Sequence, residues 1–361
     1  MDKKFIKYFK NKKILITGHT GFKGSWLTLW MLSLGAKVIG VSKNIPTKPS
    51  HYNLLNIQNK IKNYFFDIKN QSKLKLVIIK HKPDFIFHLA AQALVKKSYK
   101  ETTETWNTNT IGTINLLESL RGFNKKCHVI LVTSDKSYKN LEFTRGYHEN
   151  DILGGADPYS ASKAAAELAI QSYLKSFYSH PKNKIFISIA RAGNVIGGGD
   201  WSSDRLIPDC FKSWSKGKTV IIRSPNSTRP WQHVLEALYG YLVLATKLFQ
   251  NSNKYHGEIF NFGPNNRSNY SVQKVLEEIK GNFLTAKWKI FNSSKFYESK
   301  LLKLNSNKAK KLLNWESTLS FSETIKLVTD WYVKFYFTKS KKIDLFSLNQ
   351  IIYFQSRIKK K

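Results

Sequence analysis

Cysteine is scarce in this sequence, with two among 361 residues, Cys127 and Cys210. Two cysteines cannot build a disulfide framework, and neither stands in a spacing that ligates a metal. The sequence therefore excludes a small disulfide-stapled module and predicts no metal site. A chain without disulfides also favours a reducing compartment, so we expect a cytoplasmic protein.

Long apolar runs are absent too. A membrane-spanning helix needs about eighteen or more apolar residues in a row, and the chain has no such stretch. The segment 1–5 is not followed by an apolar run and small residues, so we expect no signal peptide. Hydrophobic residues still make up 42% of the chain, which is enough for a full core. The length predicts two domains or one large one.

Acidic residues and arginine are the other scarce types. Lysine and arginine total 59 against 24 aspartate and glutamate, and the net charge of +35 by itself favours a nucleic-acid partner. Only eight of the 59 are arginine, the residue best suited to bases and phosphates, and the lysines are spread over the whole chain. We therefore expect no specific nucleic-acid partner. The last residues, 356–361, are expected to form a solvated, frayed end.

Three glycines follow the first apolar segment at a regular spacing. We predict a strand over 13–17 and a helix over 25–34, and between them Gly18, Gly21 and Gly24 give the pattern GxxGxxG. The first glycine allows a tight turn, the second lets the backbone approach a pyrophosphate, and the third lets the helix pack closely on the strand. The pattern predicts a dinucleotide site at the helix N-terminus.

An acidic residue is missing where such a site usually has one. After a second predicted strand, 37–41, come Ser42, Lys43 and Asn44 in place of Asp or Glu. Ser42 can hydrogen-bond a ribose and Lys43 can tolerate a 2′-phosphate, so this feature leaves NAD and NADP open and predicts weaker cofactor binding. Asp67, at the end of another strand, is predicted to accept a hydrogen bond from adenine. Its alternative role is a helix N-cap.

Tyr159 and Lys163 lie four residues apart in a segment rich in good helix formers. Positions i and i+4 share one face of a helix, so the two side chains are expected to be neighbours. An ammonium favours the phenolate, and we predict that Lys163 lowers the pKa of Tyr159 below its usual value of ~10. The alternative is a surface pair on an amphipathic helix.

The rest of the chain predicts an α/β fold with a Rossmann-like, doubly wound parallel sheet and a smaller, mixed α/β C-terminal domain. Further strands are predicted at 85–89, 129–133 and 185–191, and helices at 110–120, 161–178, 271–280 and 319–336. We predict a cofactor-binding domain at 1–190, to which 232–262 returns, a substrate-binding domain at 191–345 and a basic tail at 346–361.

Several segments resemble the extended short-chain dehydrogenase/reductase family, in particular its CDP-glucose 4,6-dehydratase branch. The family order is seen in the glycine loop, His88-Leu89-Ala90-Ala91, Asn109 and Tyr159-x-x-x-Lys163. The narrower likeness lies in the segments 17–26, 132–136, 198–201, 204–209 and 229–235. The resembling blocks run from about residue 12 to 245, with a weaker match to about 336.

The resemblance implies NAD as the cofactor and a nucleotide sugar, CDP-glucose, as the substrate. It implies a cofactor site made by Gly18, Thr20, Gly21, Phe22, Lys23, Gly24, Ser42, Asp67, Ile68, Leu89, Ala90, Ala91, Asn109, Thr133, Tyr159 and Lys163. It implies substrate contacts from Gln92, Asn194, Arg205 and Arg229. Arginine at 191 and 223 adds to this expectation, because arginine is so rare here.

The resemblance also implies a lyase reaction with catalytic Ser134, Asp135, Lys136, Tyr159 and Lys163. Tyr159 would take the proton of the sugar 4-hydroxyl as hydride leaves C4, Ser134 would bond the 4-oxygen, and Asp135 would protonate the departing 6-hydroxyl. Lys136 stands where many relatives have Glu as the C5 base; whether it acts as the base or stabilises the enolate stays open. Asn109 would hold the Tyr159 helix through backbone bonds.

The product implied is CDP-4-dehydro-6-deoxy-glucose, used in deoxysugar synthesis for surface polysaccharide such as lipopolysaccharide O-antigen. Relatives pair through two helices, so a homodimer or homotetramer is implied, with 110–120 and 161–178 as the candidates. Two alternatives remain: a related nucleotide-sugar dehydratase or 4-epimerase, and a non-catalytic dinucleotide sensor. An epimerase has no need of Asp135, and a sensor has no need of Tyr159 and Lys163.

Overall fold

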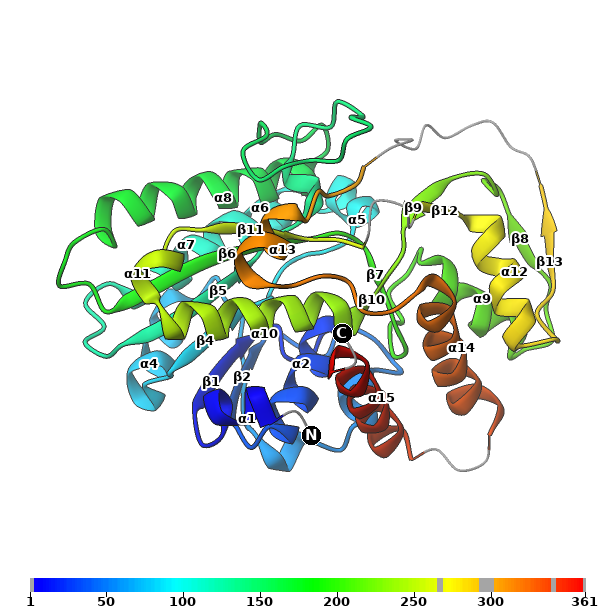
Figure 1. Ribbon diagram of the computed structural model, residues 1–361, viewed down its shortest axis with the longest axis horizontal. Helices are drawn as coiled ribbons and strands as arrows, with labels where there is room; N and C mark the ends of the chain where they lie inside the picture. The colour runs from blue at the N-terminus through cyan, green and yellow to red at the C-terminus, as the bar shows by residue number, and fades with distance from the viewer. Residues whose placement is uncertain (1–2, 265–268, 292–301, 339–341, 360–361) are drawn as a thin grey trace.

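A seven-stranded parallel sheet forms the centre of the larger part of the molecule, with a smaller part at one end (Figure 1). The structure is a computed structural model that describes residues 3–264, 269–291, 302–338 and 342–359. The strand order is β11-β6-β5-β4-β1-β2-β3, with every neighbouring pair parallel. The strands are β1 (Lys13–Thr17), β2 (Lys37–Ser42), β3 (Lys62–Phe65), β4 (Phe85–His88), β5 (Cys127–Val132), β6 (Ile185–Ala192) and β11 (Ile259–Phe262).

The predicted fold class, a doubly wound parallel sheet in an α/β protein, is confirmed by this topology. The strand order reverses between β1 and β4, where chain connections leave the sheet in opposite directions. In such sheets the crevice beyond the carboxyl ends of these strands is where dinucleotides bind. The fold therefore brings the ends of β1, β4 and β5 to one edge, beside the glycine loop.

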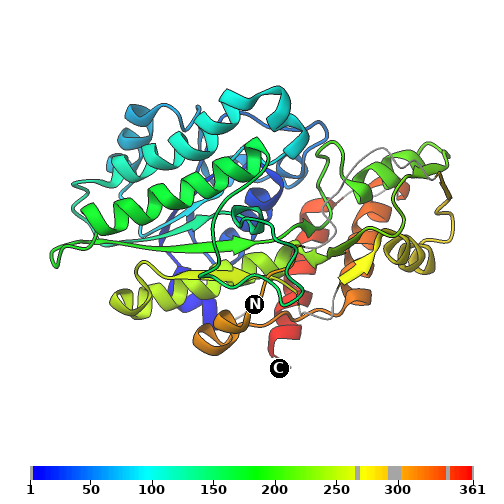
Figure 2. The same cartoon turned by 90° about the horizontal axis from the view of Figure 1, so that it is seen from above.

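Helices cover both faces of the sheet, because side chains of each strand alternate between the faces. Ile14 and Ile16 of β1 pack with α2 and α10 on one face, and Leu15 packs with α4, α7 and α8 on the other. Figure 2 shows α8 on one side of the sheet and α10 on the opposite side. The helices of these layers are α1 (Lys3–Phe9), α2 (Phe22–Ser33), α4 (Gln71–His81), α7 (Gly112–Leu120), α8 (Pro158–Phe177), α10 (Val234–Gln250) and α13 (Asn307–Leu313).

The smaller part contains three two-stranded pairs and three helices. β7 pairs with β10, β8 with β13 and β9 with β12. The elements are β7 (Val195–Ile196), α9 (Leu206–Trp214), β8 (Val220–Ile222), β9 (Thr228–Pro230), β10 (Gln232–His233), β12 (Asn269–Ser271), α12 (Val272–Asn282), β13 (Trp288–Ile290) and α14 (Phe321–Phe337). One apolar core runs through both parts without a break.

Short helices complete the connections. They are α3 (His51–Leu54), η1 (Gln58–Lys60), α5 (Val95–Lys100), α6 (Thr102–Trp106), the π-helical η2 (Asn107–Ile111), η3 (Asp135–Ser137) and α11 (Ser252–Tyr255). The segment predicted to return to the first domain supplies α10 and β11, which pack on and pair with the sheet. Helix α13 also packs on β11, although it lies within the range predicted for the substrate-binding domain.

The C-terminal segment differs from the prediction. It forms α15 (Ile343–Lys359), which packs against α2 and α14. Phe354 is fully buried with its ring edge-on to Trp30, and Arg357 forms a 2.8 Å ion pair with Glu323. The frayed end predicted for 356–361 is therefore wrong over 356–359, because this segment buries an apolar face; 360–361 lie outside the described residues.

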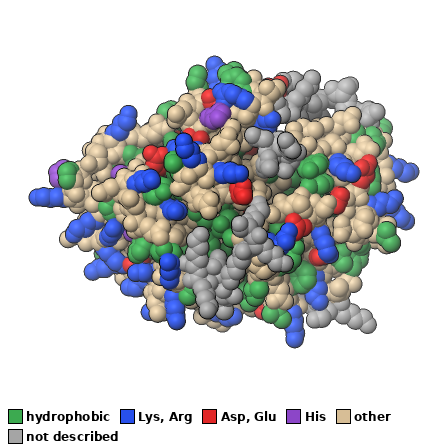
Figure 3. Space-filling model, viewed as in Figure 1, with side chains coloured by type: hydrophobic (Ala, Val, Ile, Leu, Met, Phe, Trp, Pro, Cys, Tyr) green, Lys and Arg blue, Asp and Glu red, His purple; other side chains and the backbone are tan. Residues whose placement is uncertain are grey.

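Basic side chains are spread out in the structure, as they are along the sequence. Lysine and arginine side chains are scattered over the face shown in Figure 3 and form no single basic band there. Within the described ranges, no helix is long and apolar enough to cross a membrane. In the same ranges no group of three or more His, Cys, Asp or Glu lies together as metal ligands would.

Candidate active site

The glycine loop has the shape that its spacing predicts. Gly18 has a φ of +77°, and a Cβ there would lie 2.8 Å from the backbone N of Ala90. A Cβ on Gly24 would lie 2.0 Å from the Gly18 carbonyl oxygen, so the helix can approach the turn only without a side chain. Gly21 is the N-cap of α2 and gives no side-chain cap. The first amides of α2, including those of Phe22 and Lys23, thus face the crevice as donors for a phosphate.

The end of β2 differs from the prediction. The Ser42 hydroxyl is buried, accepts from the Thr20 amide at 3.3 Å and contacts His19 Nδ1 at 2.8 Å. The Thr20 hydroxyl donates to the Asn44 carbonyl at 2.7 Å. Ser42 therefore holds the glycine loop through Thr20 and His19, and its hydrogen bond to a ribose stays a prediction.

Lys43 and Asp67 belong to one ion-pair network. Lys43 Nζ lies 3.1 Å from Asp67 Oδ2 and 3.0 Å from Glu104 Oε1, and Lys69 contacts the same two carboxylates. Asp67 is not the N-cap of the helix that follows, because Asn70 caps α4. The two carboxylates beside Lys43 oppose a 2′-phosphate, so the ion pairs do not favour the tolerance predicted from Lys43 alone. Glu104 was not found from the sequence.

Residues that follow β4 lie against the glycine loop. The amides of Leu89 and Ala90 bond the Thr17 carbonyl at 3.1 Å and the Thr17 hydroxyl at 3.3 Å. Ala91 follows them at the same sheet edge. Ile68, predicted with them, is buried, and its carbonyl accepts from Asn115 at 3.2 Å. The fold thus brings the ends of β1, β3 and β4 to one crevice.

Asn109 ties this crevice to α8 from the π-helical turn η2. Its side chain accepts from the Gln92 amide at 2.9 Å and donates to the Gln92 carbonyl at 3.1 Å. It reaches α8 through the Ser162 hydroxyl at 2.9 Å, not through the backbone bonds expected of it. The Gln92 side chain folds back onto Leu94 and Thr105, so its predicted substrate contact is not supported by this geometry.

Tyr159 and Lys163 lie on the buried face of α8. The helix starts at Pro158, three residues before the predicted start at 161, because the Asp157 carboxylate caps the Ser160 amide at 3.0 Å and Pro158 occupies the first turn. Burial raises the pKa of Tyr159 to about 12 and lowers that of Lys163 to about 8. The predicted lowering of the Tyr159 pKa is therefore wrong for the protein alone, because burial disfavours the phenolate more than the Ser134 hydroxyl and the Arg205 charge favour it.

Ser134, Asp135 and Lys136 begin a 3₁₀ turn directly after β5 and Thr133. The Ser134 hydroxyl donates to Asp135 Oδ1 at 3.0 Å and accepts from the Lys136 amide at 3.2 Å. Asp135 is buried, and this burial raises the pKa of its carboxyl above the usual value. A Cβ on Gly193 would lie 3.2 Å from Asp135 Oδ2, so the carboxylate faces the chain after β6. Burial therefore favours the protonated form of this carboxyl relative to a free one.

A fully buried ion pair between Arg191 and Glu167 connects the two catalytic segments, helix α8 and the residues after β5. Arg191 Nε lies 2.9 Å from each oxygen of Glu167, and its Nη1 donates to the Tyr138 hydroxyl at 2.6 Å. Glu167 also accepts from the Thr133 hydroxyl at 2.6 Å. Arg191 is 0% exposed, so the substrate role expected for it is wrong. The sequence did contain a sign of this role, because an arginine at the end of an apolar strand is expected to be buried and to need a partner.

Replacing Arg191 with Met should lower the free energy of unfolding by about 3–5 kcal/mol, because the Glu167 carboxylate is then buried without its partner. Urea unfolding followed by circular dichroism measures this loss. Arg121→Met is the matched control, since the ion pair of Arg121 with Glu118 is partly exposed and should contribute less than about 1 kcal/mol. Equal losses in the two variants would contradict the role given to Arg191.

Lys23 and Tyr241 add a second lysine–tyrosine contact that the sequence did not reveal. Lys23 Nζ donates to the Tyr241 hydroxyl at 3.4 Å. Burial lowers the pKa of Lys23 to about 8, and the charges of Asp135, Arg205 and Lys163 also act on it. The Lys23 side chain therefore points toward the catalytic residues, while its amide belongs to the glycine loop.

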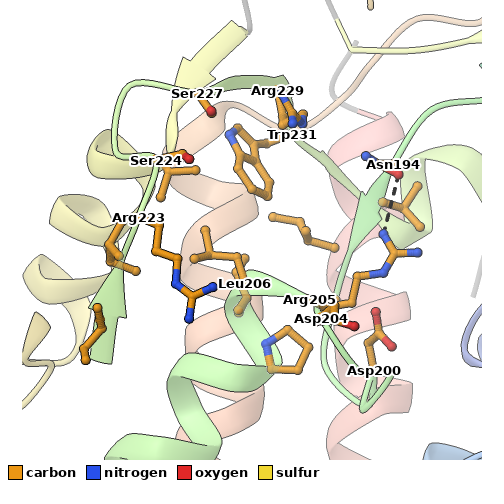
Figure 4. Close-up of a pocket in the computed structure, with 18 residues that line it drawn as sticks. Asn194, Asp200, Asp204, Arg205, Leu206, Arg223, Ser224, Ser227, Arg229 and Trp231 are labelled. Carbon is orange, nitrogen blue, oxygen red and sulfur yellow. Dashed lines mark hydrogen bonds between the residues drawn. The ribbon is translucent and has the colours of Figure 1, made fainter. Parts of the chain in front are cut away.

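A cavity of about 360 Å³ lies in the smaller part. It is lined by Asn194, Val195, Ile196, Gly197, Asp200, Asp204, Arg205, Leu206, Ile207, Pro208, Ile221, Ile222, Arg223, Ser224, Ser227, Arg229, Trp231 and Val272. Figure 4 shows Asn194 and Arg205 on one side, joined by a 3.5 Å hydrogen bond, and Arg223 on the opposite side. Arg229 and Trp231 lie at its upper rim in that view.

The chain matches a family of known proteins. The family model of GDP-mannose 4,6 dehydratase matches residues 15–328. The chain belongs to this family. A curated CDP-glucose 4,6-dehydratase of Salmonella typhimurium is 40% identical over 336 residues, which are 92% of this chain and 92% of that protein.

Solved structures of the family share the fold. An epimerase of Methanothermobacter thermautotrophicus superposes with a TM-score of 0.80 at 23% identity, covering 92% of this chain and 95% of that one. A dTDP-glucose 4,6-dehydratase of Bacillus anthracis in complex with NAD superposes with a TM-score of 0.75 at 24% identity, covering 90% of this chain and 97% of that one. These likenesses establish the family's architecture for the chain.

Proposed function

We propose that this protein is a lyase that converts CDP-D-glucose into CDP-4-dehydro-6-deoxy-D-glucose and water, with NAD as cofactor. The observation that carries the proposal is the contact between α8, which holds Tyr159 and Lys163, and the turn that holds Ser134, Asp135 and Lys136. An oxidising pair alone fits many reactions, whereas a buried carboxyl with a raised pKa beside it fits the loss of water. The 40% identity to a CDP-glucose 4,6-dehydratase over 92% of both chains supports the same reaction.

The residues present fit NAD. The uncapped N-terminus of α2 offers amides to a pyrophosphate, and the tight contacts at Gly18 and Gly24 leave the room that it needs. The carboxylates of Asp67 and Glu104 pair with Lys43 just after β2 and would repel a 2′-phosphate there, which favours NAD over NADP. Bound NAD would supply a hydride acceptor for C4 of the sugar and then a hydride donor for C6.

Tyr159 takes the proton of the sugar 4-hydroxyl in the first step. Since burial holds the phenol protonated in the protein alone, the step depends on the positive charges of Lys163 and of the bound cofactor to stabilise the phenolate. Ser134 is placed to bond the 4-oxygen, because its hydroxyl lies between the turn and α8. The 4-ketone that results makes the C5 proton acidic.

Water is then lost between C5 and C6. Asp135, whose burial raises its pKa, donates a proton to the departing 6-hydroxyl. Lys136, whose charge acts on Asp135, either removes the C5 proton or stabilises the enolate that forms. Asn194, Arg205 and Arg229 hold the diphosphate, for which charge-assisted contacts from arginine are well suited.

A substrate panel tests the proposed function. The protein is incubated with CDP-, dTDP-, GDP- and UDP-glucose, with and without NAD, and the alkaline absorbance of a 4-keto-6-deoxy sugar is followed. We expect turnover of CDP-glucose without net reduction of NAD. Formation of CDP-galactose alone, or preference for another nucleotide, would overturn the proposal.

We also propose that the protein forms a homodimer through α8 and the neighbouring helices. Leu168 of α8 is 58% exposed, and Ile111 and Trp106 on the helices that contact α8 are 44% and 36% exposed. Adjacent exposed apolar side chains on neighbouring helices are typical of a covered surface.

We propose further that the protein is cytoplasmic and serves deoxysugar synthesis for surface polysaccharide. Both cysteines are free and buried, which supports the cytoplasmic location.

Replacing Leu168 with Asp should convert the dimer into monomers, because two charges would then face each other across the pairing surface without solvent. Sedimentation velocity measures the change. Leu284→Asp is the control, since Leu284 is 82% exposed outside this surface and its replacement should leave the dimer intact. A Leu168→Asp variant that sediments as wild type would contradict the assignment of the surface.

A further inference from the structure

The cavity has a catalytic end and a distal end. Asn194 lines it and directly follows Gly193, the residue that faces the Asp135 carboxylate. The charge of Arg205 acts on both Tyr159 and Lys23, whereas neither Arg223 nor Arg229 contributes to their shifts. The Asn194–Arg205 side of the cavity therefore adjoins the reacting groups.

Arg223 marks the distal end. It follows β8 directly and lies across the cavity from Asn194, with Ser224 beside it and Leu206 between the two sides (Figure 4). Within the described part of the chain its guanidinium makes no hydrogen bond or ion pair, although it points into the cavity. Its five N–H donors are thus available to a ligand.

The order of sugar, diphosphate, ribose and base in a nucleotide sugar determines which of these groups can reach Arg223. If the sugar lies at Tyr159 and Asp135, the diphosphate comes next and the ribose and base follow. Arg205 is the arginine of the cavity that adjoins the reacting groups, so the diphosphate is expected near it, and the base is the part left for the distal end. The chain has eight arginines among 59 basic residues, and three of the eight line this one cavity. This use of a rare residue favours contacts that lysine cannot make.

We propose that Arg223 selects cytosine, with its guanidinium fork donating to the O2 and N3 atoms of the base. This inference rests on the proposed function and names the residue that gives it its nucleotide specificity. Cytosine presents two adjacent acceptors on that edge, which match the two parallel donors of a guanidinium. Uracil and thymine carry a proton on N3, so one N–H of the fork would meet another donor instead of an acceptor.

One donor of the fork would face the N3 proton of uracil or thymine without a partner, and this mismatch determines how large the selectivity is. A hydrogen bond that involves a charged group typically changes an affinity by about 10–100-fold, because the unmatched group loses water without gaining a partner. We therefore expect CDP to bind at least tenfold more tightly than UDP or dTDP.

Calorimetric titration of CDP and UDP into the NAD-saturated protein tests the inference without requiring turnover. Arg223→Leu should weaken CDP binding about 10–100-fold and UDP binding less than about threefold, so that discrimination is lost. Arg223→Lys keeps the charge but not the fork, and should also lose discrimination while retaining part of the affinity. Lys218→Leu is the control: it removes one exposed charge next to β8 without touching the cavity, and both affinities should stay at the wild-type values.

Equal weakening of CDP and UDP in Arg223→Leu would overturn the inference, because it would show a contact to the diphosphate that both share. Unchanged affinities, or a wild type that does not prefer CDP, would overturn it as well. Arg223 is an exposed residue, and substitutions at such positions seldom disturb folding. Failure of the proposed function is seen separately, as absence of CDP-glucose turnover in a wild type that still discriminates CDP from UDP.

Discussion

Replacing Tyr159 with Phe should reduce turnover of CDP-glucose by about 10³-fold, because proton transfer by a positioned group contributes about 10²–10⁴-fold. The substitution removes one hydroxyl from a side chain that is only 8% exposed and leaves its packing unchanged. Binding of NAD and of CDP should therefore stay within about twofold of wild type. The rate of 4-keto product formation and calorimetric titration measure the two effects.

Tyr173→Phe is the matched control on the same helix. Its hydroxyl donates to Glu118 at 2.6 Å, away from the catalytic residues, so its loss should leave turnover nearly unchanged. If Tyr159→Phe turned over at the wild-type rate, the phenol would not be the base. If it lost cofactor binding as well, Tyr159 would act through structure and not through proton transfer.

Replacing Asp135 with Asn should stop the loss of water while leaving the earlier steps intact. The amide keeps the shape of the side chain but cannot donate an acidic proton to the 6-hydroxyl. In D₂O, recovered CDP-glucose should then carry deuterium at C5, because oxidation at C4 and proton loss at C5 still occur and reverse. We expect formation of the 6-deoxy product to fall by about 10²–10⁴-fold, as measured by mass spectrometry of product and recovered substrate.

Asp330→Asn serves as the control, since Asp330 forms a surface pair with Lys326 and should leave the product rate unchanged. A variant at Asp135 that forms product at the wild-type rate would exclude this residue as the acid. One that shows neither product nor exchange at C5 would place Asp135 in the oxidation step. Lys136→Met should abolish the exchange, whether Lys136 acts as the base or stabilises the enolate.

Features that depend on neighbouring residues could be predicted from the sequence. The glycine loop, the N-terminus of α8 and the Tyr159–Lys163 pair each need contacts within one or two turns of chain. Parallel strands also bring their ends to one edge, so the meeting of Ser134 and Tyr159 follows once the fold class is known. These features can be recognised in the local sequence because backbone geometry determines them.

Features that depend on distant partners could not be predicted. Arg191 was expected at the substrate because arginine is rare, but it pairs with Glu167, and only the three-dimensional packing reveals this. The contact of Lys23 with Tyr241 joins residues that are 218 positions apart. The pKa of Tyr159 was misjudged for the same reason, since the sequence shows the nearby ammonium but not the depth of burial.

Transfer of a label within the substrate tests the central claim most directly. CDP-glucose that carries deuterium at C4 is incubated with the protein and NAD, and the product is analysed by NMR and mass spectrometry. We predict that the label appears in the C6 methyl group of a 4-keto-6-deoxy sugar, because the hydride that leaves C4 returns to C6 of the same molecule. Label that remains at C4 in an epimerised hexose, or that leaves the substrate altogether, would contradict the account.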